Sequence, residues 1–364
     1  MSASTRLFSP PFCPAPRCRF HVDSRGWRFK RKGFYRRRAA PQRIPRFLCL
    51  HCRRSFSSQT FSTTYFLKRP DLLEALFLRL VACSGYRQIA RALDVSPTTV
   101  LRQTIRLGRH CLLFHERLRP KGPLHEPIAF DGFESFEFSQ YTPVHFHVAV
   151  GTGSHFLYGF TDSELRRKGR MTDAQRSRRA ELERRFGRPD PRSIQREVRA
   201  LLALVLPEKS RADLVSDEHP AYPPALRALR DRISTHRTVA SRVARTPHNP
   251  LFPVNLLDLL VRHSSANHKR ETIAFSKRRQ SAAERLWIFA VWRNCVKSFS
   301  ERRRDASPAQ RLGLLPRRLT VHEILDRRLF RSRIALPERM RRYYDRETPT
   351  RRIPNGNAFR TQLA

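Results

Sequence analysis

The stretch "IAFDGFESFEF", Ile128–Phe138, decides the fold of this chain because it sets acids into an apolar run with the period of a β-strand. If the strand is straight, Asp131 and Glu137 share one face, because successive side chains alternate between faces. Glu134 then lies on the apolar face, unless a β-bulge at Gly132 turns its side chain outward. We predict that Asp131 is the functional acid of the stretch, and we expect Glu137 to be solvated.

Outside this stretch the chain is strongly basic. It has 73 Lys and Arg against 31 Asp and Glu, a formal charge of +42, and only nine of the basic residues are Lys. A charge of this size predicts a polyanionic partner, and guanidinium groups pair bidentately with phosphate. A GC-rich genome would explain part of the Arg excess, but it would not explain the scarcity of acids. The composition therefore favours a nucleic-acid partner.

The chain has no N-terminal apolar segment typical of a secretory signal. Its longest apolar runs, "LLALVL" (201–206) and "WIFAVW" (287–292), are too short to span a bilayer. Seven cysteines, an odd number, predict reduced thiols or metal ligands rather than disulfides. We expect a cytoplasmic, nucleoid-associated protein without a membrane partner.

Four cysteines form two close pairs near the N-terminus, in "CPAPRC" and "CLHC": Cys13, Cys18, Cys49 and Cys52. Two thiolate pairs on short turns predict a tetrahedral site for structural Zn²⁺ in a zinc ribbon, which we assign to residues 1–62. A redox pair or unrelated core thiols are the alternatives. The spacing of the first pair is wide, so His21 is an alternative ligand.

Residues 1–60 contain 15 Lys and Arg and a single acid, Asp23. Within them, "RFKRKGFYRRR" (Arg28–Arg38) alternates aromatic and cationic side chains, as expected for a ribbon that contacts DNA. A solvated loop is the alternative interpretation.

Residues 63–122 show helical periodicity. In "QIARALDVSPTTVLRQTIRLG" a short helix is followed by a turn at "DVS", with Ser96 as N-cap and Pro97 at the first helical position of a second helix. This predicts a helix-turn-helix domain, although any small three-helix domain can show the same pattern. The side chains expected to face DNA are Thr98, Thr99, Arg102, Gln103 and Arg106.

After the linker "RPKGP" (119–123) the pattern changes to the alternation of strands. The elements expected in order are strands at 128–138, 142–151 and 155–161, a basic helical insertion at about 163–207, a strand ending at Asp217, a helix and a further strand, "RISTHRTVA". Three meandering strands followed by strands that alternate with helices predict an α/β core with a mixed sheet of RNase H type. We assign this core to residues 123–300.

Asp131 and Asp217 would lie on neighbouring strands of this sheet. Paired carboxylates repel each other unless a divalent cation lies between them, and Mg²⁺ takes oxygen ligands. Two such ions support the in-line displacement of a phosphodiester. Each Asp taken alone is equally typical of a strand-end residue that caps a turn.

The order of zinc ribbon, helix-turn-helix and RNase H-like core resembles the bacterial insertion-sequence transposases of the DDE class. The motifs that carry the resemblance over about residues 10–300 are "CPAPRC…CLHC", "RFLCLHCRRSFSSQTF", "QIARALDVSPTTVLR", "FDGFESF", "SDEHPAY" and "NPLFPVNLLDLLVRH…NHKRETIAFSKR". The resemblance implies cleavage of element ends by water, and attack of the freed 3′-OH on target DNA. Asp131 and Asp217 match the first two acids of the family triad. It also implies double-stranded DNA as partner and a homo-oligomer that pairs two ends.

The third acid departs from the family pattern. In relatives a Glu precedes an Asn at the start of a helix, whereas "NPLFPVN" has Phe252 three residues before Asn255. The nearest substitute is Asp258, on the same helical face as Asn255, and it completes our predicted catalytic set. Glu271 and Glu284 are alternatives, and Glu284, beside an apolar stripe, requires either a metal or an Arg partner.

Two segments are assigned only in general terms. The insertion at about 163–207 is expected to contact DNA or another subunit, and residues 301–364 are expected to form an Arg-rich, partly ordered tail with phosphate contacts.

The alternative function is a catalytically inactive DNA-binding protein, either a regulator or a decayed transposase. A third hypothesis is a structure-specific nuclease, which would cut DNA without joining it. The transposase hypothesis and its inactive alternative make different predictions only for the role of the carboxylates.

Overall fold

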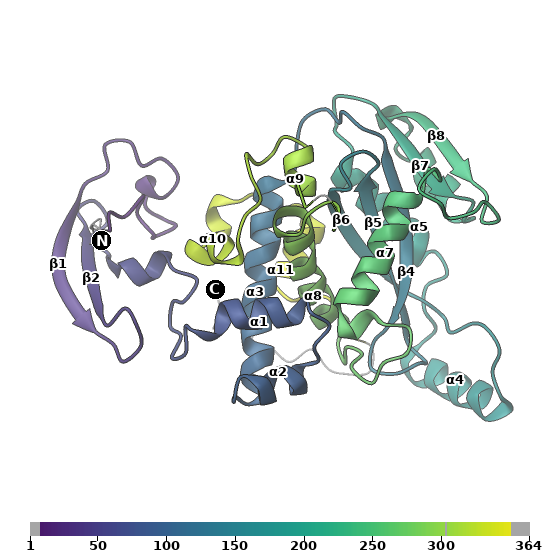
Figure 1. Ribbon diagram of the computed structural model, residues 1–364, viewed down its shortest axis with the longest axis horizontal. Coiled ribbons are helices and arrows are strands. Elements are labelled where there is room, and N and C mark those ends of the chain that lie inside the picture. The colour runs from purple at the N-terminus through teal and green to yellow at the C-terminus, as the bar shows by residue number, and fades with distance from the viewer. Residues whose placement is uncertain (1–7, 303, 351–364) are drawn as a thin grey trace.

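The structure, a computed structural model, describes residues 8–302 and 304–350. A small three-stranded unit lies at one end, a group of helices lies in the middle, and a five-stranded sheet with its own helices lies at the other end (Figure 1). The last described segment returns from the sheet to the helices and to the N-terminal unit.

The N-terminal unit is an antiparallel sheet in the order β1-β2-β3, formed by β1 (Phe29–Arg36), β2 (Arg43–Cys49) and β3 (Ser55–Ser57). It is completed by the short 3₁₀ helices η1 (Arg19–His21) and η2 (Ser58–Phe61). Its core is small and aromatic, with Phe47 and Phe56 stacked 5.6 Å apart. A unit of this size buries little apolar surface, so it requires a further source of stability.

The helical part contains α1 (Leu72–Leu80), α2 (Tyr86–Ala92) and α3 (Pro97–Leu118). Ser96 caps α3 by accepting a hydrogen bond from the Thr99 N–H at 3.1 Å, as the sequence predicted. Helix α3 continues past Gly108 to Leu118. Its second half is buried against α8 (Arg279–Val291), and a Cβ at Gly108 would lie 2.9 Å from Glu284 Cα. Gly108 is therefore a close-contact position and not a helix end.

The predicted mixed sheet is confirmed. It contains β4 (Ile128–Phe136), β5 (Pro143–Gly151), β6 (Leu157–Glu164), β7 (Ala212–Asp217) and β8 (Ile233–Val239), in the order β6-β5-β4-β7-β8. The first three strands form an antiparallel meander, and the pairs β4-β7 and β7-β8 are parallel. Parallel pairing needs a crossover, which the helical segments between the strands supply.

Helices cover both faces of this sheet: α5 (Ser193–Val205), α6 (Tyr222–Arg227), α7 (Phe252–Ser264) and α8. On β6, Thr161 donates a hydrogen bond to the Glu197 carbonyl of α5 at 2.8 Å. The next side chain back along the strand, Phe160, packs on Trp287 of α8 with ring centroids 4.3 Å apart. Since successive side chains alternate, α5 and α8 lie on opposite faces of the sheet.

The insertion at 163–207 is not one helical stretch. Its first residues, Ser163 and Glu164, complete β6, and two separate helices follow, α4 (Asp173–Phe186) and α5. Gly187 ends α4 with a positive φ of 81°, and prolines at 189 and 191 keep the connection out of helical conformation.

The end of β4 corrects two expectations. Glu134 is exposed without any bulge in the β4-β5 register. Glu137 is 2 % exposed and accepts a hydrogen bond from the Arg279 backbone N–H at 3.2 Å, so the expectation that it is solvated is wrong. The strand alternation stops at Phe136, because the chain then bridges to Ser276.

Residues 304–350 of the expected tail are folded. They form α9 (Pro308–Arg311), α10 (Val321–Asp326) and α11 (Glu338–Tyr344). Ile324, Met340 and Tyr343 are at most 2 % exposed and belong to the main hydrophobic core. That core runs continuously from α1–α3 into the sheet, across the predicted boundary at residue 122. None of the helices in the described ranges is long and apolar enough to cross a membrane.

Candidate metal centres and nucleic-acid interface

The two predicted cysteine pairs come together at one end of the ribbon. The four Sγ atoms of Cys13, Cys18, Cys49 and Cys52 all lie within 4.8 Å of one another, and the Cys13 and Cys52 sulfurs are 3.6 Å apart. Tetrahedral zinc with Zn–S bonds of about 2.3 Å would hold its sulfurs about 3.8 Å apart. The thiol cluster therefore fits a structural Zn²⁺ site.

The local chain forms this site through two tight turns. The Cys18 N–H donates to the Ala15 carbonyl at 2.9 Å, and the Arg53 N–H donates to the Cys49 carbonyl at 3.0 Å. Burial acts to raise the pKa of the Cys49 thiol, but N–H groups of Cys52, Trp27 and His51 outweigh it and lower that pKa to about 6. Donors aimed at a sulfur stabilise the thiolate, which is the form that binds a metal.

His21 is not among the ligands, so its alternative role is wrong. Its Nδ1 lies 2.8 Å from the Cys13 carbonyl oxygen, and its Nε2 lies 2.7 Å from Ser332 Oγ. Both ring nitrogens are therefore engaged. His21 instead joins the ribbon to the C-terminal segment, which also hydrogen-bonds it through the Arg333 side chain and the His21 carbonyl.

The sheet brings the first two predicted acids together. Ala129 of β4 pairs with Val215 of β7 in parallel register. Continuing that register by two residues brings Asp131 opposite Asp217. In a parallel pair, residues in register point to the same face, so both carboxylates project to one side of the sheet.

Asp258 approaches the same place from α7, which packs against β4 and β5. A cavity of about 480 Å³ opens between these elements. Its lining includes Asp131, Glu134, His145, Arg245, Asp258, Arg262 and Arg270. Burial raises the pKa of Asp131 to about 6, and the negative charges of Asp217 and Asp258 act in the same direction. The three acids therefore share one electrostatic environment.

The carboxylates are nevertheless separate. Among the described residues, the four cysteines are the only group of three or more potential metal ligands whose donor atoms lie within 4.8 Å of one another. Asp258 is turned toward Arg262, with its Oδ1 2.9 Å from the guanidinium Nε. Arg262 also donates to the carbonyls of His268 at 3.1 Å and Glu134 at 3.3 Å, which holds it at the rim of the cavity.

The other candidates for the third acid lie elsewhere. Glu271 is exposed and does not line the cavity. Glu284 is 2 % exposed, and its Oε1 lies 2.7 Å from Arg346 Nε and 3.3 Å from Gln280 Nε2. Its carboxylate has the Arg partner that its apolar surroundings require.

Further groups lie around the two strand acids, and of these Tyr222 and His219 were not singled out from the sequence. The Tyr222 hydroxyl donates to Asp131 Oδ1 at 3.3 Å, and the His219 backbone N–H donates to Asp217 Oδ1 at 3.0 Å. His145 packs over Gly132, where a Cβ would come within 2.5 Å of its ring. The sequence signal for Tyr222 and His219 was present, because both lie within five residues of Asp217 in "SDEHPAY".

The predicted DNA-reading face of α3 is only partly open. Thr98 and Arg102 are exposed, whereas Thr99, Gln103 and Arg106 are half-buried. Arg106 turns inward and donates to the Thr63 carbonyl at 2.9 Å. The first turn of α3 therefore carries the accessible part of this face.

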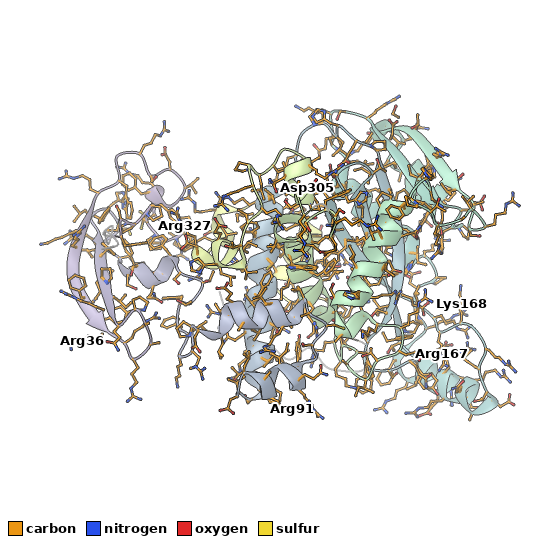
Figure 2. The ribbon with its side chains drawn as sticks, viewed as in Figure 1. Arg36, Arg91, Arg167, Lys168, Asp305 and Arg327 are labelled. Atoms are coloured by element: carbon orange, nitrogen blue, oxygen red, sulfur yellow. The ribbon has the colours of Figure 1, made fainter. Side chains whose placement is uncertain are left out.

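Cationic side chains cover the outer faces of the molecule, as the side-chain view shows (Figure 2). Strand β1 is exposed along its whole length after Phe29, and Arg36, labelled at its end, projects from it. Arg43 of β2 lies over the Phe34 ring at 3.9 Å. Strand β1 is also an edge strand, so its basic and aromatic side chains are accessible to a large partner.

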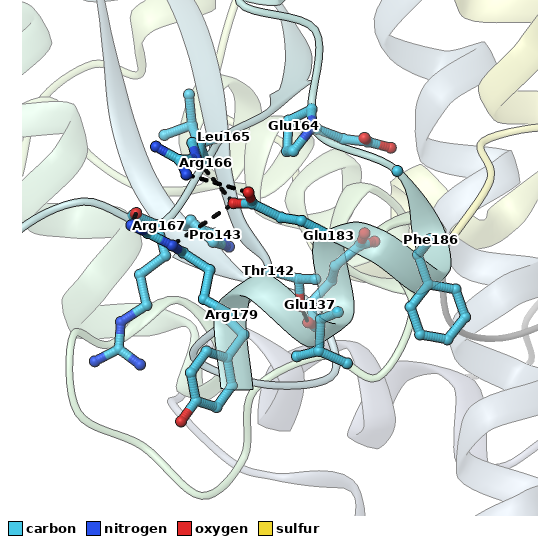
Figure 3. A pocket seen from close by; sticks show the side chains of 14 residues that line it. Glu137, Thr142, Pro143, Glu164, Leu165, Arg166, Arg167, Arg179, Glu183 and Phe186 are labelled. Atoms are coloured by element: carbon cyan, nitrogen blue, oxygen red, sulfur yellow. Dashed lines mark hydrogen bonds and ion pairs between the residues drawn. The ribbon is translucent and has the colours of Figure 1, made fainter. Parts of the chain in front are cut away.

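A second, small pocket of about 30 Å³ lies where α4 meets the ends of β5 and β6 (Figure 3). Arg166 and Arg179 both reach the Glu183 carboxylate, at 2.8 and 3.7 Å. The Arg166 ion pair joins α4 to the segment that follows β6, whereas the Arg179 ion pair lies within α4, and Arg184 and Arg185 stay exposed. A role of α4 in contacting DNA or another subunit stays a prediction.

No protein-family model matches the chain. No curated protein matches it. Among solved structures, one chain of the cryoEM structure of a simian T-cell lymphotropic virus intasome in complex with the PP2A regulatory subunit B56 gamma is similar at a TM-score of 0.25 and 14% identity. The match covers 72% of this chain and 75% of that chain. A TM-score this low does not support a conclusion about fold or function.

Proposed function

We propose that this protein is a DNA transposase of the DDE class, which cleaves element ends and joins them to target DNA. The observation that carries the proposal is the parallel register of β4 and β7. Continued by two residues beyond Ala129 and Val215, that register would bring Asp131 opposite Asp217, and Asp131 and Asp258 line one cavity of about 480 Å³. The strand order β6-β5-β4-β7-β8 supports the RNase H-like core on which the proposal rests.

The three carboxylates would hold Mg²⁺, whose preference for oxygen ligands they meet. The raised pKa of Asp131 supports this assignment, because the repulsion from Asp217 that contributes to it is relieved when a cation lies between them. When bound, the ions would activate the attacking oxygen and stabilise the leaving oxygen of a phosphodiester.

The remaining groups of the cavity position these acids and the DNA. Tyr222 orients Asp131 through its hydroxyl, and the His219 backbone N–H orients Asp217. Arg245 and Arg270, exposed at the cavity, supply positive charge for the phosphates beside the reacting one. In cleavage, a water oxygen forms the new bond to phosphorus and the 3′ oxygen leaves as a hydroxyl. In joining, that 3′-OH forms a new bond to the phosphorus of a target phosphodiester, and the 3′ oxygen of the target strand leaves as a hydroxyl.

DNA binding is assigned to the basic units outside the cavity. The accessible first turn of α3, with Thr98 and Arg102, supports a helix-turn-helix contact in the major groove. The exposed basic edge strand β1 supports a second contact to the phosphate backbone. Joining two ends in one reaction requires both in the same complex, so a homo-oligomer on double-stranded DNA is part of the proposal.

The test is incubation with labelled duplexes of the ends that flank the coding sequence, in Mg²⁺ or Mn²⁺. We expect strand cleavage and joining, with a loss of at least about a thousandfold in Asp131→Asn and Asp217→Asn, because each removes a metal ligand. Asp213→Asn is the matched control, since Asp213 lies on β7 but is exposed and bonds Thr235. Tight DNA binding with no cleavage in either metal would refute the enzyme.

One observation favours the second candidate, a catalytically inactive DNA-binding protein. Asp258 is ion-paired with Arg262, and the three acids do not form a closed ligand set. In that case Asp131→Asn would leave every measurable property of the DNA complex unchanged, including its affinity in the presence of Mg²⁺.

A further inference from the structure

Three arginines converge on a small cavity between the ribbon and the helices. Arg106 and Arg109 come from α3, and Arg328 comes from the segment after α10. The cavity has a volume of about 50 Å³ and is closed on other sides by Thr63, His110 and Tyr344, among others. It is thus assembled from three parts of the chain that are far apart in sequence.

These arginines have no acidic partner. None of the three forms an ion pair with a carboxylate in the described ranges 8–302 and 304–350. The residues outside those ranges contain no Asp or Glu. Glu284 lies within electrostatic range of Arg109, but its carboxylate is bound by Arg346 at 2.7 Å. No side-chain carboxylate of the described chain therefore pairs with the cluster.

The guanidinium groups also lack part of their hydrogen bonding. Arg109 is 6 % exposed, and its Nε and Nη1 have no hydrogen-bond partner among the described residues, nor has Arg106 Nε. Buried N–H groups of a charged side chain without acceptors are strongly unfavourable. Burial, together with the charges of Arg328 and Arg109, lowers the pKa of Arg106 to about 10.

Other contacts hold the arginines in place without neutralising them. Arg109 lies over the Tyr344 ring at 4.2 Å, and Arg328 lies 5.1 Å from the rings of Tyr65 and Phe330. His110 faces the Ile324 carbonyl through Nε2, and burial lowers its pKa to about 4, so it adds no charge at neutral pH. The cluster is therefore a fixed set of cationic N–H donors around a space the size of a small anion.

We propose that Arg106, Arg109 and Arg328 form a binding site for a phosphate group. A phosphate offers several acceptor oxygens and up to two negative charges, and guanidinium forks match its geometry. The group is either a phosphate of bound DNA or a free phosphate ion. The site is separate from the carboxylate cavity and does not depend on its chemistry.

The test is calorimetric titration of the zinc-loaded full chain with inorganic phosphate, in chloride at fixed ionic strength. Wild type is compared with Arg106→Gln and Arg328→Gln. The control is Arg327→Gln, because Arg327 is the sequence neighbour, its side chain is 85% exposed, and it is labelled in Figure 2. We expect the control to bind like wild type and each of the other two to bind at least about tenfold more weakly, as the loss of one charge-assisted contact implies.

Equal affinities in all four proteins would mean binding to the general basic surface, and would overturn the site. If the Gln variants do not fold by circular dichroism, Arg106→Lys and Arg328→Lys replace them. These keep the charge and lose the fork, and an unchanged phosphate affinity in both would likewise overturn the proposal.

A second titration, with the protein saturated with duplex DNA, identifies the source of the group. Loss of the phosphate signal means that a DNA phosphate occupies the site. If the DNA-saturated protein still binds phosphate, and Arg328→Gln still removes that binding, the site takes a free phosphate ion.

Discussion

The thiol cluster of the ribbon and the carboxylate cavity of the sheet differ in how complete they are. The four sulfurs already lie within 4.8 Å of one another, with N–H donors aimed at Cys49. The acids at the cavity belong to different elements, and Asp258 is held by Arg262. The ribbon has only a small aromatic core beside its thiol cluster, whereas the core of the sheet is extensive and does not include the acids.

This difference indicates two kinds of site. A structural metal site is part of the fold and has to be complete when the chain folds. A site for hard divalent ions can stay open, because the substrate supplies some of the ligands. The two kinds of site predict different responses to substitution, of which the largest are given first.

The largest effect is expected from Cys49→Ser. Removing a zinc ligand should release the metal and unfold the ribbon, since zinc contributes on the order of 10 kcal/mol to small metal-dependent units. Bound zinc measured by atomic absorption should fall to near zero, and the fluorescence of Trp27, whose indole contacts Cys49, should change. Cys83→Ser, at a thiol outside the cluster, should leave both signals unchanged. Helical circular dichroism should persist in both variants. Its loss in Cys49→Ser would show that the helices and the sheet do not fold independently of the ribbon.

The next effect separates the three candidates for the third acid. Glu284→Gln should lower the free energy of unfolding by about 2 to 4 kcal/mol, because it removes the buried carboxylate that Arg346 and Gln280 both contact. Glu271→Gln, at an exposed position, should change it by no more than about 0.5 kcal/mol. Asp258→Asn should have a small effect on stability and a large one on cleavage. The measurements are urea denaturation and the cleavage assay, run on all three variants. If Glu284→Gln alone abolished cleavage while the protein stayed folded, the third acid would be Glu284 and not Asp258.

A smaller effect is expected on the pH dependence of stability. Asp131 has a folded-state pKa of about 6, above its ordinary 3.8, so the folded state favours the protonated form. Its contribution is fully present below about pH 4 and is lost as the pH rises toward 6, because the unfolded chain ionises first. Without divalent cations, wild type should therefore lose roughly 1 to 2 kcal/mol relative to Asp131→Asn over this range. Added Mg²⁺ should restore it, and parallel pH profiles of the two proteins would show that the acids do not interact.

The smallest effect concerns the surface of the ribbon. The double variant Arg31→Gln and Arg36→Gln on β1 should reduce the slope of log affinity for duplex DNA against log salt by about 1.8, since each phosphate contact contributes about 0.9. Arg25→Gln is the matched control, because Arg25 is exposed but paired with Asp23 at 2.6 Å. Equal slopes in all three proteins would remove β1 from the interface.

The sequence predicted the features that depend on local periodicity and spacing. The alternation along β4 and β5, the cap at Ser96 and the pairing of the four cysteines required only neighbouring residues. The errors came from long-range contacts. Glu137 is buried because the Arg279 backbone N–H and the Thr350 side chain reach its carboxylate from distant parts of the chain.

The candidate site shows the same division. Strand order alone predicted Asp131 and Asp217 on neighbouring strands, and the helical phase predicted Asp258 on a polar face of its helix. The guanidinium of Arg262 that binds Asp258, and Arg346 that binds Glu284, could not be anticipated, because any of 64 arginines was an equally good partner on sequence grounds.

The link between the ribbon and the last described segment has a consequence for biosynthesis. The thiol cluster is translated well before its partners in the last described segment, because His21 bonds Ser332, 311 residues later, and Phe330 closes the aromatic core of the ribbon. A nascent chain can therefore bring its four cysteines together before the segment that orients the ribbon has been made. A product that stops before residue 324 would carry a ribbon without the contacts that hold it against the rest of the molecule.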